Sequence, residues 1–138
     1  MRDRSLVHPF MHLFVYGTLR RAAGHPMHAS LRAVANLVGE ARVRGRLYMI
    51  EQYPGLVLDE AAAWVVGELY RLRDPTVLAD LDEYEGISPD DQPPHEYRRV
   101  RRLVQLLDGG EHAAWIYEYD WSTEGRARIH SGDFLRRQ

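Results

Sequence analysis

The acidic residue Glu85 stands out because of its position in a short helical pattern. The segment Asp74-Pro75-Thr76 predicts a helix start, because Asp is a preferred N-cap and Pro fits the first helical position. Leu78 and Leu81 follow at helical spacing, and Glu85 lies within about 20° of Leu78 on the helical wheel. A carboxylate on this apolar face is partly desolvated, which raises its pKa toward neutrality. A group of that pKa suits general acid and base catalysis.

The same pattern leaves a competing interpretation of Glu85. Glu83 lies about 140° from Leu78, so we expect it to face water. Glu85 stands next to Gly86, a typical helix stop, and at a helix end its side chain can reach solvent without any functional role. The helix therefore selects one carboxylate for proton transfer and leaves plain solvent exposure as the alternative.

A second candidate site is the turn Tyr16-Gly17-Thr18-Leu19-Arg20. It follows a short apolar run that is rich in strand-forming residues. Successive backbone N–H groups in such a turn can bind an anion, and Arg20 would add positive charge. The repeated glycines and the Lys of a phosphate-binding loop are missing. An ordinary strand-to-loop turn explains the same residues.

These two places carry a resemblance to a known family. The turn that begins at Tyr16 resembles a signature of the γ-glutamylcyclotransferase-like (AIG2-like) family, and Leu81-Asp82-Glu83-Tyr84-Glu85-Gly86 resembles another. Further motifs stand in the family's order, namely Tyr53-Pro54-Gly55-Leu56, Val66-Gly67-Glu68-Leu69-Tyr70, Tyr97-Arg98-Arg99 and Ser131-Gly132-Asp133-Phe134. The ordered set, which runs from Leu13 to Phe134, carries the resemblance. The segment Ala22 to His28 departs from the pattern.

The resemblance implies an enzyme that needs no metal or organic cofactor. The α-amine of a γ-glutamyl compound would attack its own γ-carbonyl, so that 5-oxoproline forms and an amine or amino acid leaves. Glu85 would be the general acid and base of this reaction. The substrate would be bound by Tyr16, Gly17, Thr18 and Leu19, which hold either its carboxylate or the developing oxyanion. Arg20 and Tyr97 complete the candidate set, although Tyr97 can equally be a tyrosine that packs within its strand.

The remaining patterns describe a scaffold made mainly of strands. Strands are expected over residues 12–18, 42–49, 56–58, 64–72, 97–107 and 112–121, with helices over 75–85 and 29–37. Gly67 indicates a bulge or a close backbone approach. In the last strand Trp115, Tyr117, Tyr119 and Trp121 share one face, which we expect to be core. Regular βαβ alternation is missing, which argues against a doubly wound sheet.

We therefore expect an α+β fold, mainly β, in the form of a small mixed or antiparallel β-barrel with flanking helices. Residues 12–135 form the expected γ-glutamylcyclotransferase-like domain, and residues 1–11 form an N-terminal extension. The chain has 138 residues, which suits a single domain. No internal repeat or linker divides it.

Composition excludes several classes of protein. The 18 basic and 20 acidic side chains leave a net charge of -2, which excludes a nucleic-acid binder held mainly by bulk charge. The absence of Cys excludes disulfides and thiolate chemistry, and it favours a reducing cytoplasm. No apolar run approaches the ~20 residues that span a bilayer, and the first residues lack the apolar region of a signal peptide.

Two other motifs are set aside. The run Tyr97-Arg98-Arg99-Val100-Arg101-Arg102 combines an aromatic ring with Arg side chains and could stack on RNA, but such runs are more often a solvated strand face. The pair His25 and His28 lacks a third metal ligand at a suitable spacing. The expected partner is a small-molecule γ-glutamyl substrate, with no nucleic acid or membrane, in a monomer or homodimer. The alternative function is a non-catalytic small-molecule binding module that retains the same pocket.

Overall fold

The computed structural model describes residues 11–17, 31–74, 76–85 and 93–136. Its elements are β1 (Met11–Val15), β2 (Ala35–Met49), β3 (Pro54–Leu58), β4 (Trp64–Leu72), α3 (Val77–Tyr84), β5 (Tyr97–Leu106), β6 (Glu111–Tyr119), β7 (Ala127–Arg128) and the 3-10 turn η2 (Phe134–Arg136). The strand-rich composition of this part of the chain agrees with the sequence prediction.

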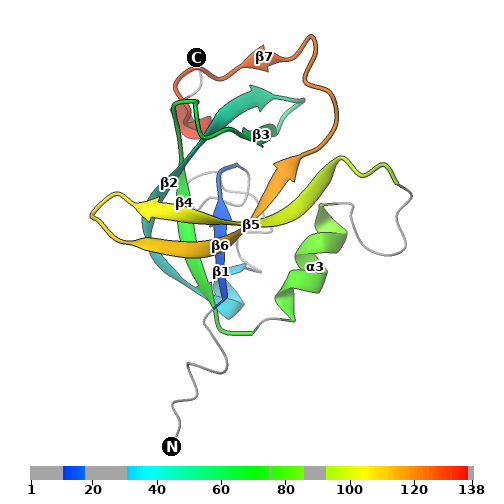
Figure 1. Ribbon diagram of the computed structural model, residues 1–138. Coiled ribbons are helices and arrows are strands. Elements are labelled where there is room, and N and C mark those ends of the chain that lie inside the picture. The colour runs from blue at the N-terminus through cyan, green and yellow to red at the C-terminus, as the bar shows by residue number, and fades with distance from the viewer. Residues whose placement is uncertain (1–10, 18–30, 75, 86–92, 137–138) are drawn as a thin grey trace, which may run out of the picture.

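Five strands close into a barrel in the order β2, β4, β1, β6 and β5, and the ring is completed where β2 also pairs with β5. The β1–β6 pair is parallel, while the other four pairs of the ring are antiparallel. Because full closure leaves no open sheet edge, a small β domain is protected from edge-to-edge association. The predicted mixed barrel with flanking helices is confirmed (Figure 1).

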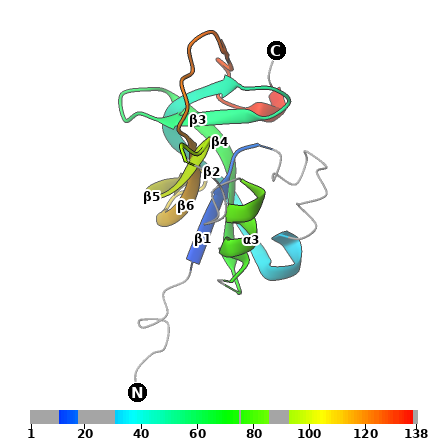
Figure 2. The ribbon, with the colours of Figure 1, turned by 90° about the vertical axis from the view of Figure 1, so that its right-hand side faces the viewer.

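The long strand β2 belongs both to the barrel and to a smaller layer of strands beyond it. Its first part pairs with β4 from Ala35↔Leu72 onward, and its last part pairs with β3 and β7 beyond the barrel. Figures 1 and 2 show β3 and β7 above the barrel, on the side that carries the C-terminus. This extension places the β2–β3 turn and the start of β3 beside the barrel end.

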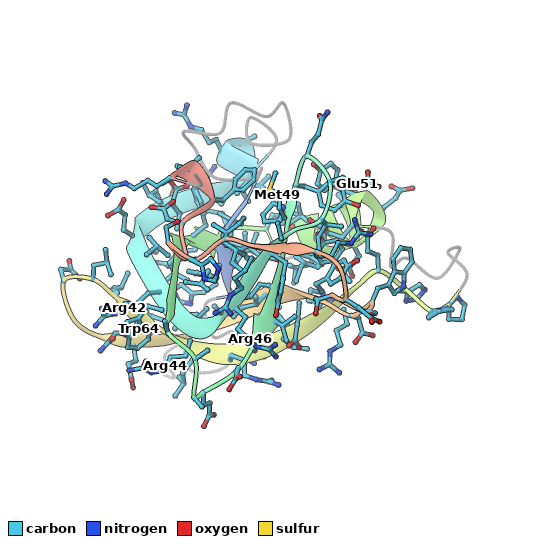
Figure 3. The ribbon with its side chains drawn as sticks, turned by 90° about the horizontal axis from the view of Figure 1, so that it is seen from above. Arg42, Arg44, Arg46, Met49, Glu51 and Trp64 are labelled. Carbon is cyan, nitrogen blue, oxygen red and sulfur yellow. The ribbon has the colours of Figure 1, made fainter. Side chains whose placement is uncertain are left out.

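Side chains alternate along β2 as the sequence predicts. Val43 and Leu47 are buried, while Arg44 is exposed on the opposite face. The guanidinium carbons of Arg42 and Arg44 lie 4.1 and 4.0 Å from the centroid of the Trp64 ring, and Figure 3 shows the three residues together on this face. Through these cation–π contacts the two arginines bind an aromatic side chain outside the hydrophobic core.

Two hydrophobic clusters hold the fold together, and β1 contributes to both. Leu13 and Val15 pack toward α3, together with Leu78 and Leu81 of that helix. Phe14 belongs to the second cluster, which fills the barrel interior with side chains from every barrel strand. Because β1 is buried on both faces, its sequence is a continuous apolar run with no alternation.

Gly67 marks a close backbone approach, as one of its two sequence interpretations requires. A Cβ at this position would collide with the carbonyl oxygen of Val15 and would lie 2.7 Å from Cζ of Phe14. The register shift that β2 and β4 do show lies elsewhere, between Leu37 and Gly39 of β2. Gly67 therefore lets β4 sit directly against β1 inside the barrel.

The helix expected over residues 29–37 is largely wrong. Residues 31–34 are helical, residues 29 and 30 lie outside the described part, and β2 begins at Ala35. The Ala- and Leu-rich composition favours a helix locally, but pairing of Ala35 with Leu72 of β4 satisfies the backbone and overrides that propensity.

Smaller corrections concern two element ends. The helix α3 starts at Val77, with Thr76 at the N-cap, and Asp74 accepts hydrogen bonds from the backbone N–H and hydroxyl of Thr76. The predicted aromatic face of β6 is buried at Tyr117 and Tyr119, but Trp121 lies past the strand end and is 47% exposed. A side chain beyond the last ladder pair has no neighbouring strand to cover it.

Candidate active site

A cavity of about 450 Å³ opens where the end of β1, the β2–β3 turn, the C-terminus of α3 and the first residues of β5 meet. Its volume falls within the range typical of small-molecule sites. It is lined by Phe14, Val15, Tyr16, Gly17, Gln52, Tyr53, Pro54, Tyr84, Glu85, Glu96, Tyr97 and Tyr117. Segments far apart in the chain therefore converge on one small space.

The carboxyl group of Glu85 faces this cavity from the end of α3. Burial raises its pKa from the ordinary 4.5 to about 7, and the nearby charges of Glu96 and Asp82 act in the same direction. Glu83, two residues earlier, is exposed. The helical wheel thus separates the two carboxylates correctly, and the structure favours desolvation of Glu85 over free exposure to solvent.

Asp82 fastens the end of α3 to the barrel, which the sequence analysis did not foresee. Its Oδ1 lies 2.9 Å from Nε of Arg99 on β5, and its Oδ2 accepts a hydrogen bond from the same guanidinium at 3.1 Å. The hydroxyl of Tyr117 on β6 donates to Oδ1 at 2.7 Å. With Leu81 buried on the adjacent face, these contacts fix the direction in which Glu85 points. Leu81 therefore packs the helix against the core, Asp82 anchors it to β5 and β6, and Glu85 lines the cavity.

Two buried tyrosines join the walls of the cavity. The hydroxyl of Tyr16 donates to the carbonyl of Tyr117 at 2.5 Å and accepts from the backbone N–H of Leu56 at 3.3 Å. The hydroxyl of Tyr97 donates to the carbonyl of Pro54 at 2.7 Å. Burial raises the pKa of both phenols, so both stay neutral donors at physiological pH. Both side chains line the site, and their hydroxyls already have protein partners.

Gly17 is required by the close approach of β1 to the start of β3. A Cβ on Gly17 would lie 2.7 and 2.8 Å from Cγ and Cδ of Pro54, closer than side-chain atoms pack. The strand expected over residues 56–58 begins two residues earlier in the structure, at Pro54, which covers Gly17. The Tyr-Gly and Tyr-Pro-Gly motifs are therefore two sides of one contact at the cavity wall.

A second carboxylate, Glu96, also lines the cavity, and its charge acts on Glu85. The hydroxyl of Tyr53 donates to its Oε2 at 2.6 Å, and the two side chains come from different loops. Burial and this hydrogen bond raise the pKa of Tyr53, which keeps its hydroxyl protonated as a donor. Glu96 is not among the residues predicted from the sequence, because its position directly before β5 has no periodic signal of its own.

Several predicted positions lie outside the described residues. Thr18, Leu19 and Arg20 follow directly on the last described residue of the turn, and the histidines at 25 and 28 belong to the same stretch. Across the described ranges, no group of three or more His, Cys, Asp or Glu side chains is arranged to hold a metal ion. In those same ranges, no helix has the length and apolar character needed to cross a bilayer.

The arginine run on β5 is largely engaged within the protein. Arg98 donates two hydrogen bonds to Oε1 of Glu118, a buried carboxylate whose Oε2 accepts the backbone N–H of Leu58. The guanidinium carbon of Arg99 lies 4.6 Å from the Trp115 ring centroid, in addition to its pair with the helix. These contacts give the first two arginines of the run partners within the protein, and the guanidinium carbon of Arg101 also lies 5.6 Å from the Trp115 ring centroid.

Comparison with known proteins extends these observations to a family. The family described as gamma-glutamyl cyclotransferase, AIG2-like, matches residues 13–136. The gamma-glutamylcyclotransferase family protein YtfP of Escherichia coli K12 is 34% identical over 128 residues, which cover 92% of this chain and 98% of that protein. A gamma-glutamylaminecyclotransferase of Rattus norvegicus is 32% identical over 108 residues, which cover 70% of this chain and 65% of that protein.

Solved structures show the same fold. An uncharacterized protein from Pyrococcus horikoshii superposes with a TM-score of 0.65 at 30% identity. The match covers 90% of this chain and 89% of that protein. An AIG2-like protein from Mus musculus superposes with a TM-score of 0.64 at 26% identity, with 84% and 90% of the two chains covered. Both solved structures therefore share the fold of this chain.

Proposed function

This chain belongs to the gamma-glutamyl cyclotransferase, AIG2-like family, and on that premise we propose that it cyclises a γ-glutamyl amine or γ-glutamyl amino acid to 5-oxoproline. The observation that carries the proposal is the carboxyl group of Glu85, which lines a cavity of about 450 Å³ with its pKa raised to about 7. A carboxyl group of this pKa is divided between its two protonation states near neutral pH, as a group that both takes and returns a proton must be.

The reaction needs protons to move in both directions. The α-ammonium nitrogen of the substrate gives one proton to the Glu85 carboxylate, and the free amine then attacks the γ-carbon. The C–N bond to the leaving group breaks as Glu85 returns that proton to the departing nitrogen. The attacking nitrogen loses its second proton as the ring amide forms, and the released amine takes up a proton to become an ammonium ion. One carboxyl group therefore suffices for both transfers.

The reaction also requires the substrate to be held in a folded conformation, and the cavity provides the space for this. Amine and carbonyl belong to one molecule, so the protein has only to hold the folded conformer in which they meet. Phe14, Tyr16 and Gly17 line the same cavity as Glu85. Backbone N–H groups that follow Gly17 would bind the substrate carboxylate or the oxyanion, for which a single donor contributes about 3–4 kcal/mol in the transition state.

The test is a comparison of two matched variants on one helix. Glu85→Gln keeps the shape of the side chain but cannot accept a proton, and we expect it to lower release of 5-oxoproline by about a hundredfold to ten-thousandfold. Glu83→Gln removes the same charge from an exposed position and should leave turnover unchanged. The substrate panel consists of γ-glutamyl amines, γ-glutamyl amino acids and glutathione.

The outcomes separate an enzyme from a binding module. Equal turnover by the Glu85→Gln variant would contradict the assigned role of this residue. If the wild-type protein turns over nothing on the panel while a γ-glutamyl compound raises its melting temperature, the pocket binds without catalysis. Thermal unfolding of both variants serves as the control for the fold.

A further inference from the structure

The rim of the cavity carries a carboxylate that the proton transfers do not use. Glu96 precedes β5, and Tyr53 in the β2–β3 turn holds it through a hydrogen bond of 2.6 Å. Both side chains are half-buried, and the neighbouring Gln52 is exposed, so this wall faces solvent. Tyr16 and Gly17, by contrast, are buried. Glu96 therefore lies on the open side of the cavity.

The reaction assigns each part of the substrate to a wall. The α-amine and the γ-carbonyl must reach the carboxyl group of Glu85, which lines the same cavity as Glu96. The leaving group is joined to the γ-carbon and has to depart toward solvent. Gln52 and Tyr84 are the exposed side chains among the described residues that line the cavity. An attached leaving group that departs beside Gln52 passes Tyr53 and Glu96.

In the described part of the chain, the charges along this path are of one sign. Glu85 and Glu96 are the charged side chains among the described residues that line the cavity. Arg126 comes near this side of the fold, but its guanidinium donates to the carbonyl of Ile50 at 2.5 Å and does not line the cavity. An anionic leaving group would face the carboxylate of Glu96, whereas an ammonium group would form a charge-assisted hydrogen bond with it.

We propose that Glu96, held by the Tyr53 hydroxyl, is a specificity-determining residue that binds a second ammonium group on the leaving amine. The inference rests on the proposed function and narrows its substrate class to γ-glutamyl amides of diamines and similar polyamines. The carboxylate of Glu96 makes the pocket selective for substrates that carry an additional positive charge beyond the scissile bond.

The experiment compares three leaving groups of nearly equal length. γ-Glutamylputrescine ends in an ammonium group, γ-glutamylpentylamine ends in a methyl group at the same place, and γ-glutamyl-δ-aminovalerate ends in a carboxylate. We expect wild-type kcat/KM to fall in that order. Because loss of one charge-assisted hydrogen bond costs roughly tenfold or more, Glu96→Gln should reduce the putrescine-to-pentylamine ratio of kcat/KM by about tenfold.

The ratio isolates binding of the leaving group from effects on the reaction itself. Removing the Glu96 charge also acts on Glu85, but that change affects all three substrates alike and cancels in the ratio. Gln keeps an acceptor oxygen for Tyr53, so the wall is retained. Glu51→Gln is the matched control: this exposed carboxylate stands beside the β2–β3 turn but does not line the cavity, and Figure 3 shows it next to the end of β2. Its ratio should equal that of the wild type.

Each result decides the inference. A putrescine-to-pentylamine ratio that is unchanged in Glu96→Gln, or a wild-type preference for the carboxylate substrate, overturns it and leaves the cyclisation proposal standing. If no compound is turned over, the cyclisation proposal fails, and calorimetric binding of the same three compounds measures the charge preference instead. A wild-type binding preference for the ammonium compound that Glu96→Gln abolishes supports the inference, and equal affinities overturn it.

Discussion

The unusual ionisation of Glu85 predicts a specific change in how the stability of the protein depends on pH. In the unfolded chain this carboxyl group releases its proton near the ordinary pKa of 4.5, and in the folded protein it holds the proton until about pH 7. Between these values the folded state binds more protons than the unfolded state, so a rise in pH favours unfolding. The stability linked to this group is present below about pH 4.5 and is lost as pH rises through about 7.

The magnitude follows from the two pKa values. Their difference of about 2.5 corresponds to about 3 kcal/mol at 1.36 kcal/mol per pKa unit. Part of this loss is already complete at about pH 5, so the change from about pH 5 to about pH 8 is about 2.5 kcal/mol. Glu85→Gln has no proton to lose, and its stability should lack this decline.

Urea unfolding of the two proteins at a series of pH values measures the effect. We expect the free energy of unfolding of Glu85→Gln, relative to wild type, to increase by about 2.5 kcal/mol between about pH 5 and about pH 8. Other titrating groups are common to both proteins and cancel in the difference. The same subtraction for Glu83→Gln should be flat, because that side chain is exposed. Parallel curves for Glu85→Gln and wild type would refute the desolvation of Glu85.

Two further substitutions test the architecture of the site. Gly17→Ala places a Cβ within 2.7 Å of Pro54, so we expect a loss of about 1–3 kcal/mol in unfolding free energy together with reduced turnover; wild-type stability would show that the two segments are not in contact. Asp82→Asn weakens the pair with Arg99 but keeps an acceptor for Tyr117, and we expect a loss of about 1–2 kcal/mol. It should also move the acidic limb of the pH–rate profile to lower pH, because one of the charges that raises the pKa of Glu85 is removed. An acidic limb that stays in place would contradict the proximity of Asp82 to Glu85.

Local patterns in the sequence were sufficient for much of this description. The bounds of β4 at Trp64 and Leu72 match the prediction, because a run of strand-forming residues is a local feature of the sequence. The selection of Glu85 over Glu83 also needed only the helical period. Both features depend on residues a few positions apart, where the geometry of one element fixes the relative directions of the side chains.

The contacts that complete the site could not be obtained in this way. Asp82 meets Arg99 and Tyr117 only because α3 packs across the β5–β6 hairpin, and Glu96 meets Tyr53 across 43 positions of the chain. Polar pairs of this kind have no period and no local propensity, so nothing in their own neighbourhood distinguishes them from solvated side chains.

The sequence by itself thus determined most of the strands, the helix that carries Glu85, the barrel class and the one carboxylate on the apolar face of that helix. The tertiary structure decided that Ala35 begins a strand, because pairing with Leu72 of β4 outweighs a modest helix preference. It also decided that a second carboxylate, Glu96, shares the cavity, because closure of the barrel brings the β2–β3 turn and the start of β5 to the same rim. Side-chain direction along one element is local information, whereas the meeting of two loops is a property of the closed sheet.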